Sequence, residues 1–224
     1  MALVANVRSA PAATLSDLRW QPTLLGAVGN TPTFDASFAG ARRIALDDTA
    51  WVEHVGGWVQ GADGLFEHIL GIAPWEHRTV HMYDRMVEEP RLTAWYGRAL
   101  ADPSVPPVLH EMTMALRGRY DRKFNSIGAA LYRDGRDSVA WHGDRVARTL
   151  VEPVVAILSL GSERVLRMRP KGGAKGGGAA THPFRLVPGD LFVMGGETQS
   201  TWQHSVPKVA NAGARISLQF RHST

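Results

Sequence analysis

Three residues in the C-terminal half of the chain have the types and spacing of a metal site: His142, Asp144 and His204. If residues 138–144 form a strand, His142 and Asp144 point to the same side, because alternate side chains of a strand share a face. His204 is the natural third ligand. Two imidazoles and a carboxylate on one face of a metal leave three coordination positions open, as non-haem iron(II) oxygenases require for cosubstrate and dioxygen. We predict that these three residues bind the metal and form the catalytic centre.

A second pattern lies close to the C-terminus, where residues 215–221 alternate between polar and apolar types. As a strand, this segment presents Arg215, Ser217, Gln219 and Arg221 on one face. A guanidinium group binds a carboxylate through two parallel hydrogen bonds, so an arginine on this face is suited to a dicarboxylate cosubstrate. Six residues of strand span roughly 20 Å, so the two arginines serve different purposes.

Each pattern has a simpler alternative when it is taken separately. A His-x-Asp pair commonly serves surface or hydrogen-bonding roles, and an alternating strand with arginines commonly faces solvent. The two patterns support each other, because the arginine strand begins eleven residues after His204.

Composition narrows the chemistry further. The chain has no cysteine, so thiolate metal sites, disulfides and cysteine nucleophiles are excluded, and histidines and carboxylates must hold any metal. The net charge of +4 favours an anionic partner such as nucleic acid, although proteins that bind nothing anionic share such a surplus. The basic residues gather in two runs, which form either a phosphate track or solvated surfaces: Arg117, Arg119, Arg122 and Lys123, then Arg164, Arg167, Arg169, Lys171 and Lys175.

The length of 224 residues suits one domain. The N-terminal residues do not have the pattern of a secretion signal, and the sequence contains no run of 18 apolar residues. We expect a soluble cytoplasmic protein that does not enter a membrane.

The elements that position these residues can be read from hydrophobic periodicity. Residues 1–45 are rich in Ala, Pro, Thr and Gly and predict an irregular arm with short ordered pieces. Helical patterns over residues 47–70 and 105–120 predict two supporting helices, and residues 79–83 predict a strand.

After Phe124 the sequence changes to short β-rich runs between turn residues. Eight such runs suit an α+β, mainly β fold in which a jelly roll is braced from outside by the N-terminal helices. We therefore predict a single domain over residues 46–224, with its jelly-roll core at about 124–222. The glycine-rich segment Lys171–Gly178 predicts a mobile loop. The eight runs are residues 127–132, 138–144, 153–160, 164–169, 184–187, 190–194, 202–206 and 215–221.

From Pro74 to Arg221, about two-thirds of the chain, the sequence resembles the AlkB family of iron(II)- and 2-oxoglutarate-dependent dioxygenases. The order and spacing of several short motifs carry the resemblance. These are Pro90-Arg91-Leu92-Thr93-Ala94-Trp95-Tyr96-Gly97, Phe124-Asn125-Ser126, Leu131-Tyr132-Arg133-Asp134-Gly135, residues 137–144, Ser159-Leu160-Gly161, Pro188-Gly189-Asp190-Leu191 and residues 202–208.

The resemblance implies a role for each matching position. His142, Asp144 and His204 would bind Fe(II), and Tyr132 and Arg215 would hold the far carboxylate of 2-oxoglutarate. Arg221 would lie nearer the metal, and Ser217 would stand at another cosubstrate position. Residues at about 79–100 resemble the family's substrate lid, in which Arg91, Trp95 and Tyr96 would contact the substrate, as would Trp202.

The resemblance also implies a reaction. Enzymes of this family couple the decarboxylation of 2-oxoglutarate by dioxygen to hydroxylation of an N-alkyl carbon, and they release formaldehyde, succinate and CO2. The expected substrates are 1-methyladenine and 3-methylcytosine in DNA or RNA, preferably single-stranded, because the target base must leave its stack. We expect the enzyme to act as a monomer.

Four positions depart from the family pattern. Ala130 and Ser217 stand where asparagines usually contact 2-oxoglutarate, and the loss of each neutral hydrogen bond costs on the order of 1 kcal/mol. Arg145 and Val146 follow Asp144 where repair enzymes carry acidic residues that recognise the base. Two alternatives therefore stay open: an oxygenase acting on modified RNA, protein or lipid, and a catalytically idle nucleic-acid-binding jelly roll.

Overall fold

The computed structural model describes residues 7–9, 18–23, 31–82, 85–96, 103, 105–144, 150, 152–172 and 181–222. Arg145, Val146 and most of the predicted glycine loop lie outside the described residues, as do residues 83–84 and 97–100 of the predicted lid.

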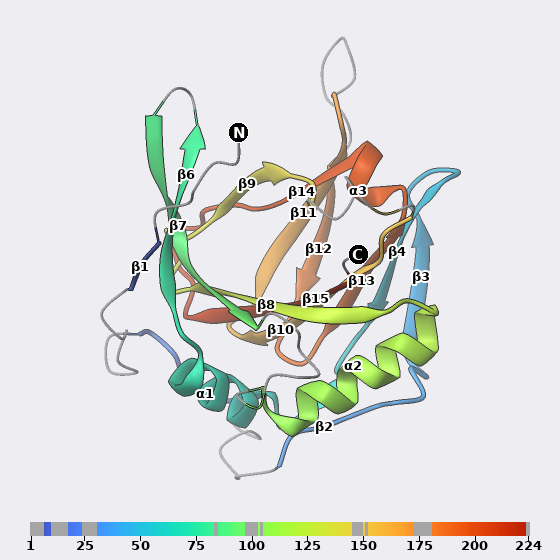
Figure 1. Cartoon of the computed structure of the whole chain (residues 1–224), viewed down its shortest axis with the longest axis horizontal. Coiled ribbons are helices and arrows are strands. Elements are labelled where there is room, and N and C mark those ends of the chain that lie inside the picture. Colours follow the sequence, from blue (N-terminus) through green and yellow to red (C-terminus); the bar gives the residue numbers. More distant parts are fainter. Residues whose placement is uncertain are drawn as a thin grey trace.

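Two antiparallel sheets form the body of the protein (Figure 1). The larger sheet has nine strands in the order β1-β6-β7-β8-β15-β10-β13-β4-β3, and the smaller has four in the order β12-β11-β14-β9. A short pair, β2 with β5, lies apart from them. The strands are β1 (Val7–Ser9), β2 (Thr33–Phe34), β3 (Ala41–Ala45), β4 (Ala50–Val55), β5 (Val59–Gln60), β6 (Glu76–Met82), β7 (Arg85–Tyr96), β8 (Phe124–Tyr132), β9 (Val139–His142), β10 (Val155–Gly161), β11 (Arg164–Pro170), β12 (His182–Leu186), β13 (Leu191–Gly196), β14 (Trp202–Val206) and β15 (Arg215–His222).

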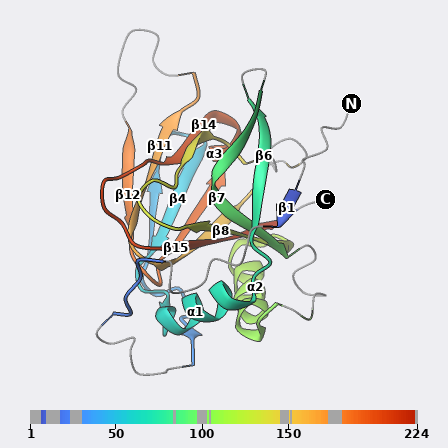
Figure 2. The same ribbon diagram turned by 90° about the vertical axis from the view of Figure 1, so that its left-hand side faces the viewer.

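The helices α1 (Ala62–Ile72) and α2 (Pro107–Tyr120) lie together beneath one face of the larger sheet, as both views show (Figures 1 and 2). A short helix, α3 (Thr198–Thr201), precedes β14. The predicted apolar face of α1 is buried against the sheet, with Phe66 and Ile69 fully enclosed. None of the described helices has the length and apolar character needed to cross a bilayer.

The two sheets enclose a second hydrophobic core between them. Tyr132, Ile157 and Phe192 of the larger sheet pack there with Met168 and Trp202 of the smaller one. Apolar side chains alternate into this space from both sheets, as in a sandwich. The result is a mainly β, jelly-roll-like fold, in agreement with the fold class predicted from the sequence.

The strands β6 and β7 form a hairpin that rises beside β9 (Figure 1). Its pairing is interrupted between Thr79↔Glu88 and His77↔Leu92, so three residues of β7 lie opposite one of β6. Such a bulge bends a strand and re-aims its side chains, and Pro90 at its centre is tolerated because a bulge leaves residues out of the ladder.

All eight β-runs predicted from the sequence are strands, and the helix predicted at 105–120 is α2. The predicted helix at 47–70 is wrong over its first half, because residues 50–55 form β4 between β13 and β3. Only Ala62–Ile72 is helical. The ordered pieces expected within residues 1–45 include β3, which forms the edge of the larger sheet.

Candidate functional site

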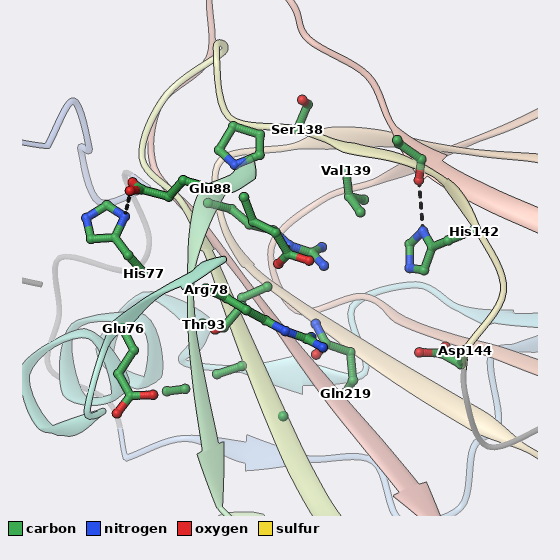
Figure 3. A pocket seen from close by; sticks show the side chains of 18 of the residues that line it. Glu76, His77, Arg78, Glu88, Thr93, Ser138, Val139, His142, Asp144 and Gln219 are labelled. Atoms are coloured by element: carbon green, nitrogen blue, oxygen red, sulfur yellow. Dashed lines mark hydrogen bonds and ion pairs between the residues drawn. The ribbon is translucent and has the colours of Figure 1, made fainter. Parts of the chain in front are cut away.

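A cavity of about 900 Å³ opens between the β6–β7 hairpin and strand β9. His142 and Asp144 line one side of it, and His77 and Glu88 of the hairpin lie on the other (Figure 3). The floor comes from β8 and β15. The described residues around it include Arg78, Glu89, Arg91, Trp95, Gly128, Trp141, Lys208, Gln219 and Arg221.

The two predicted histidine ligands face each other across neighbouring strands. His142 on β9 is the register partner of His204 on β14, and their ring centroids are 4.2 Å apart. The Nδ1 atom of His142 lies 2.8 Å from the carbonyl oxygen of Ala140. If Nδ1 carries the proton in this hydrogen bond, Nε2 keeps its lone pair for a metal.

Asp144 joins the two histidines, although it lies beyond the end of β9. Its backbone N–H donates to Oε1 of Gln199 at 2.8 Å, and its carboxylate accepts from Nη2 of Arg221 at 2.8 Å. At the intervening Gly143, a Cβ would stand 2.7 Å from the carbonyl oxygen of Gln199. The close approach of the α3 segment therefore requires glycine at this position.

Burial and mutual charge hold the three side chains in the protonation states that metal ligands need. Burial lowers the pKa of His204 to about 3, and it also lowers the pKa of His142 although Asp144 opposes this effect. Burial alone would raise the pKa of Asp144, but Arg221 and both histidines outweigh it and lower that pKa to about 2. At neutral pH the site therefore presents two neutral imidazoles and one carboxylate.

The donor set fits Fe(II), and its spacing is slightly wide. The Oδ2 atom of Asp144 is 3.9 Å from Nε2 of His204, whereas adjacent ligands about 2.1 Å from a metal lie about 3 Å apart. Within the described ranges, no three His, Asp or Glu side chains already stand at metal-binding distances. A side-chain adjustment of about 1 Å would bring this pair to that separation.

A row of buried polar residues adjoins the floor of the cavity. Tyr132 on β8 pairs with Arg215 on β15, while Nη1 of Arg91 on β7 donates to the Tyr132 hydroxyl at 2.8 Å. The guanidinium carbons of Arg91, Arg164 and Arg215 lie 5.7, 5.5 and 5.4 Å from the centroid of the Tyr132 ring. Three cations thus surround one phenol, which makes this end of the site strongly attractive to an anion.

Arg215 is 1% exposed. Its Nε donates to Oγ of Ser159 at 3.0 Å, while its buried Nη1 has no hydrogen-bond partner in the described part of the chain. Burial lowers its pKa to about 10, which still leaves it charged at neutral pH. A buried cation with an unsatisfied N–H is costly, and a bound carboxylate would relieve that cost.

Ser217 of β15 and Ala130 of β8 are register partners, two residues along each strand from the pair Arg215 and Tyr132. The Oγ atom of Ser217 accepts from Nε2 of Gln219 at 2.9 Å, so the serine is held within the row. Ala130 contributes only a methyl group to the cavity wall. The two positions where the sequence lacks the family's asparagines thus lie opposite each other on neighbouring strands.

The three aromatic residues predicted to contact the substrate lie in different surroundings. Trp95 is 57% exposed and lines the cavity, whereas Tyr96 is 1% exposed and packs in the core beside the helices. Trp202 is also buried, and its Nε1 donates to Asp47. The structure therefore brings Trp95 and Arg91 to the cavity and places Tyr96 and Trp202 elsewhere.

Much of the predicted basic track is used within the fold. Arg164 donates to the carbonyl oxygens of Asp134, Asp137 and Pro207, and Arg119 is paired with Glu53. Arg169 donates from Nε and Nη2 to Oε1 of Gln203, and its guanidinium carbon lies 4.2 Å from the ring centroid of Trp141, which lines the cavity.

Several residues of the site were not predicted from the sequence. Gln219 shares the face of the alternating strand, so its position was available from periodicity. Ser159 lies within one of the family motifs. Gln199 and Glu89 had no local signal, since a nonlocal contact and a β-bulge bring them to the site.

A jelly-roll-like fold with a His-Asp-His cluster at its mouth and a buried arginine on the floor defines the class of 2-oxoglutarate oxygenases. The chain belongs to the 2OG-Fe(II) oxygenase superfamily, whose sequence pattern matches residues 62–221.

Named relatives support the resemblance to AlkB. The chain is 36% identical to "Alpha-ketoglutarate-dependent dioxygenase alkB homolog 3" of Homo sapiens over 179 residues, which is 73% of this chain and 62% of the relative. The Bos taurus protein of the same name is 36% identical over 71% of this chain and 61% of its own length. "DNA oxidative demethylase ALKBH2" of Arabidopsis thaliana is 29% identical over 70% of this chain and 60% of the relative.

The chain thus spans about three-fifths of the length of these relatives. Among solved structures, a Pseudomonas putida prolyl-4-hydroxylase aligns with a TM-score of 0.41 and 19% identity, over 60% of this chain and 73% of that one.

Proposed function

We propose that this protein is an Fe(II)- and 2-oxoglutarate-dependent dioxygenase that demethylates N-alkylated bases in DNA or RNA, preferably single-stranded. The observation that carries the cosubstrate assignment is the buried, unsatisfied guanidinium of Arg215 beside Tyr132. It provides a site for the far carboxylate of a dicarboxylate at a depth that water hardly reaches. The names of the AlkB relatives support the choice of substrate.

Bound iron and 2-oxoglutarate would supply, with dioxygen, the oxidising power to hydroxylate an N-alkyl carbon. His142, Asp144 and His204 would hold the metal through two imidazole nitrogens and one carboxylate oxygen. Arg221 keeps Asp144 ionised through its 2.8 Å hydrogen bond. Because Gln199 holds the backbone of Asp144, the carboxylate is aimed before any metal binds.

Trp95 provides the aromatic surface for the target base. It extends from the hairpin strand into the cavity, and its ring is free of the described aromatic contacts of the core. Base–aromatic stacking is worth about 1–3 kcal/mol per base and tolerates every sequence. Stacking there requires a base that has left its helix, which is least costly in single strands.

The hairpin β6–β7 is proposed to act as the lid, since it forms the outer wall of the cavity. The basic residues Arg78 and Lys208 stand at the same cavity. They are suited to the phosphates that flank an extruded base, because such contacts position a strand without reading its sequence.

The test is product formation across a panel of oligonucleotides that carry 1-methyladenine or 3-methylcytosine, single- and double-stranded, with Fe(II), ascorbate and 2-oxoglutarate. We expect formaldehyde and the unmodified base, with faster turnover of single strands, and no product from His142→Ala. Absence of formaldehyde from every oligonucleotide would refute the repair function. Succinate release in that case would indicate an oxygenase of another substrate, and absence of succinate would indicate an idle protein.

A further inference from the structure

The charges around the cavity are not distributed evenly. The cations Arg91, Arg164 and Arg215 gather around the buried Tyr132 beside the cavity, and Asp144 is neutralised by Arg221. The hairpin lines the cavity with the carboxylates of Glu76, Glu88 and Glu89, and with the cations of Arg78 and Arg91. A substrate that enters the cavity therefore meets carboxylates on the hairpin side.

Glu89 is the acidic residue that the β7 bulge directs into this space. Its side chain lines the cavity and is 18% exposed. Its Oε2 atom lies 3.6 Å from Nε of Arg91 and has no hydrogen-bond partner among the described residues. The carboxylate is therefore inside the site, adjacent to Arg91, with hydrogen-bonding capacity unused.

The neighbouring Glu88 is more exposed and lies close to a histidine. It is 60% exposed, and Nδ1 of His77 lies 2.7 Å from its Oε1 (Figure 3). Arg91 does not fully engage Glu89, because its Nη1 donates a hydrogen bond to the Tyr132 hydroxyl. Of this described pair, Glu89 is therefore the more enclosed, and its Oε2 lacks a hydrogen bond.

Alkylated bases divide by charge. Methylation at N1 of adenine or N3 of cytosine produces a cation at neutral pH, and each of these bases keeps an exocyclic nitrogen that donates a hydrogen bond. Methylation at N3 of thymine leaves a neutral ring flanked by two carbonyl oxygens. A carboxylate attracts the first group by charge and by a charge-assisted hydrogen bond, and it repels the carbonyl oxygens of the second.

We propose that Glu89 determines selectivity for cationic alkylated bases over neutral ones. The inference rests on the proposed function. Arg145 and Val146 have no side-chain acceptor for the exocyclic N–H of a base, and the inference assigns this recognition to the carboxylate of Glu89 on the hairpin. Partial enclosure strengthens the effect, because a charge pair in a shielded cavity is screened less than one at the surface.

The experiment compares two single-stranded oligonucleotides that differ only in one base, 3-methylcytosine or 3-methylthymine, with the full chain as enzyme. We expect Glu89→Gln to lower kcat/KM for 3-methylcytosine by about 10–100-fold, the range of one charge-assisted hydrogen bond, and to change kcat/KM for 3-methylthymine by less than about 3-fold. Glu163→Gln serves as control, because it removes a carboxylate paired with Arg185 on the surface outside the cavity.

The outcomes separate the two proposals. If the wild-type protein converts both bases and Glu89→Gln lowers both equally, the proposed function stands and the selectivity role of Glu89 is overturned. That role is also overturned if Glu88→Gln changes the ratio as much as Glu89→Gln does. Loss of substrate-independent succinate release in Glu89→Gln would show that Glu89 acts only by holding Arg91 and Tyr132, which again overturns the selectivity role. Wild-type protein inactive on both bases would instead refute the proposed function.

Discussion

Arg221 and Asp144 are 77 residues apart in the sequence, and Nη2 of the arginine donates to Oδ1 of the aspartate at 2.8 Å. The contact links β15 of the larger sheet to the segment that follows β9 of the smaller sheet. One side chain thereby joins β15, which carries the proposed cosubstrate residues, to the predicted metal ligand.

Replacement of Arg221 by alanine should impair the site without unfolding the protein. Loss of a hydrogen bond to a charged group costs about 1.5–3 kcal/mol, so kcat/KM should fall by about 10–100-fold. The pKa of Asp144 should rise from about 2 towards 3.8 because its guanidinium partner is gone. Since the ionised form of Asp144 binds metal, the loss of activity at acid pH should begin at a higher pH in Arg221→Ala than in the wild type. Arg136→Ala is the control, because Arg136 pairs with Asp134 on the surface, and an unchanged acid limb in Arg221→Ala would contradict the prediction.

Cosubstrate binding should depend on Arg215 and should be visible as thermal stabilisation. With 2-oxoglutarate at 100 times its Kd, the folded state gains about 2.7 kcal/mol, which corresponds to a Tm increase of about 5–10 °C for a chain of this size. A metal that does not react with dioxygen keeps the measurement at equilibrium. Arg215→Lys should lose most of this increase, because an ammonium group cannot bind a carboxylate as a fork.

Arg215→Met provides the complementary test of the same buried charge. Without cosubstrate, this variant should be at least as stable as the wild type in urea, since it removes a cation with an unsatisfied Nη1. A large loss of stability in Arg215→Met would mean that its bond to Ser159 is structural rather than functional.

Gly128 creates the space in which Arg221 and Trp95 meet. A Cβ at this position would stand 2.8 Å from Nη1 of Arg221 and 3.3 Å from Cε3 of Trp95. Gly128→Ala should therefore displace both side chains and reduce activity by at least 10-fold, while stability changes little because the nearest atom ends a flexible side chain. Gly118→Ala on α2 has open space around it, so it should keep full activity and add about 0.5–1 kcal/mol of stability. Wild-type turnover by Gly128→Ala would refute this role of the glycine.

Glu53 should make stability depend on pH. It is 2% exposed, and it accepts hydrogen bonds from Tyr120 at 2.7 Å, Arg43 at 3.1 Å and Arg119 at 3.2 Å. Burial would raise its pKa, but these partners outweigh burial and lower it below 4.5. A lowered folded pKa stabilises the protein above pH 4.5, and that stabilisation is lost as the pH falls through the folded value.

Tyr120→Phe tests this relationship through urea unfolding at several pH values. We expect a loss of about 1–3 kcal/mol at pH 7, the cost of removing one partner from a buried charged group. The difference from wild type should shrink below pH 4.5, because Glu53 is then being protonated in both proteins. A difference that stays constant down to pH 3 would contradict the role of the Glu53 charge.

Local sequence predicted those features that depend on periodicity. The alternation of residues 215–221 predicted a strand with Arg215, Ser217 and Arg221 on one face, and these residues lie in β15 opposite Tyr132, Ala130 and Ser126 of β8. The composition of the eight β-runs predicted the jelly-roll-like fold in the same way. Such patterns can be recognised in the sequence because the side chains of any strand alternate between its two faces.

Other features depended on contacts between distant segments. Residues 50–55 carry a pattern compatible with a helix, and they form a strand because β13 and β3 pair with them on both sides. Alternation required Trp95 and Tyr96 to face opposite ways, but it could not say which one meets the cavity. The packing of α2 against the larger sheet encloses Tyr96 and leaves Trp95 exposed.

The sequence by itself determined the ligand types and the strand that carries the arginines, because these depend on residue identity and short-range geometry. Only the tertiary structure decided how they combine. The strand ends at His142, so Asp144 reaches the site through its bonds to Gln199 and Arg221. These bonds join residues far apart in the sequence, and no local period encodes a contact that forms only when the two sheets close on each other.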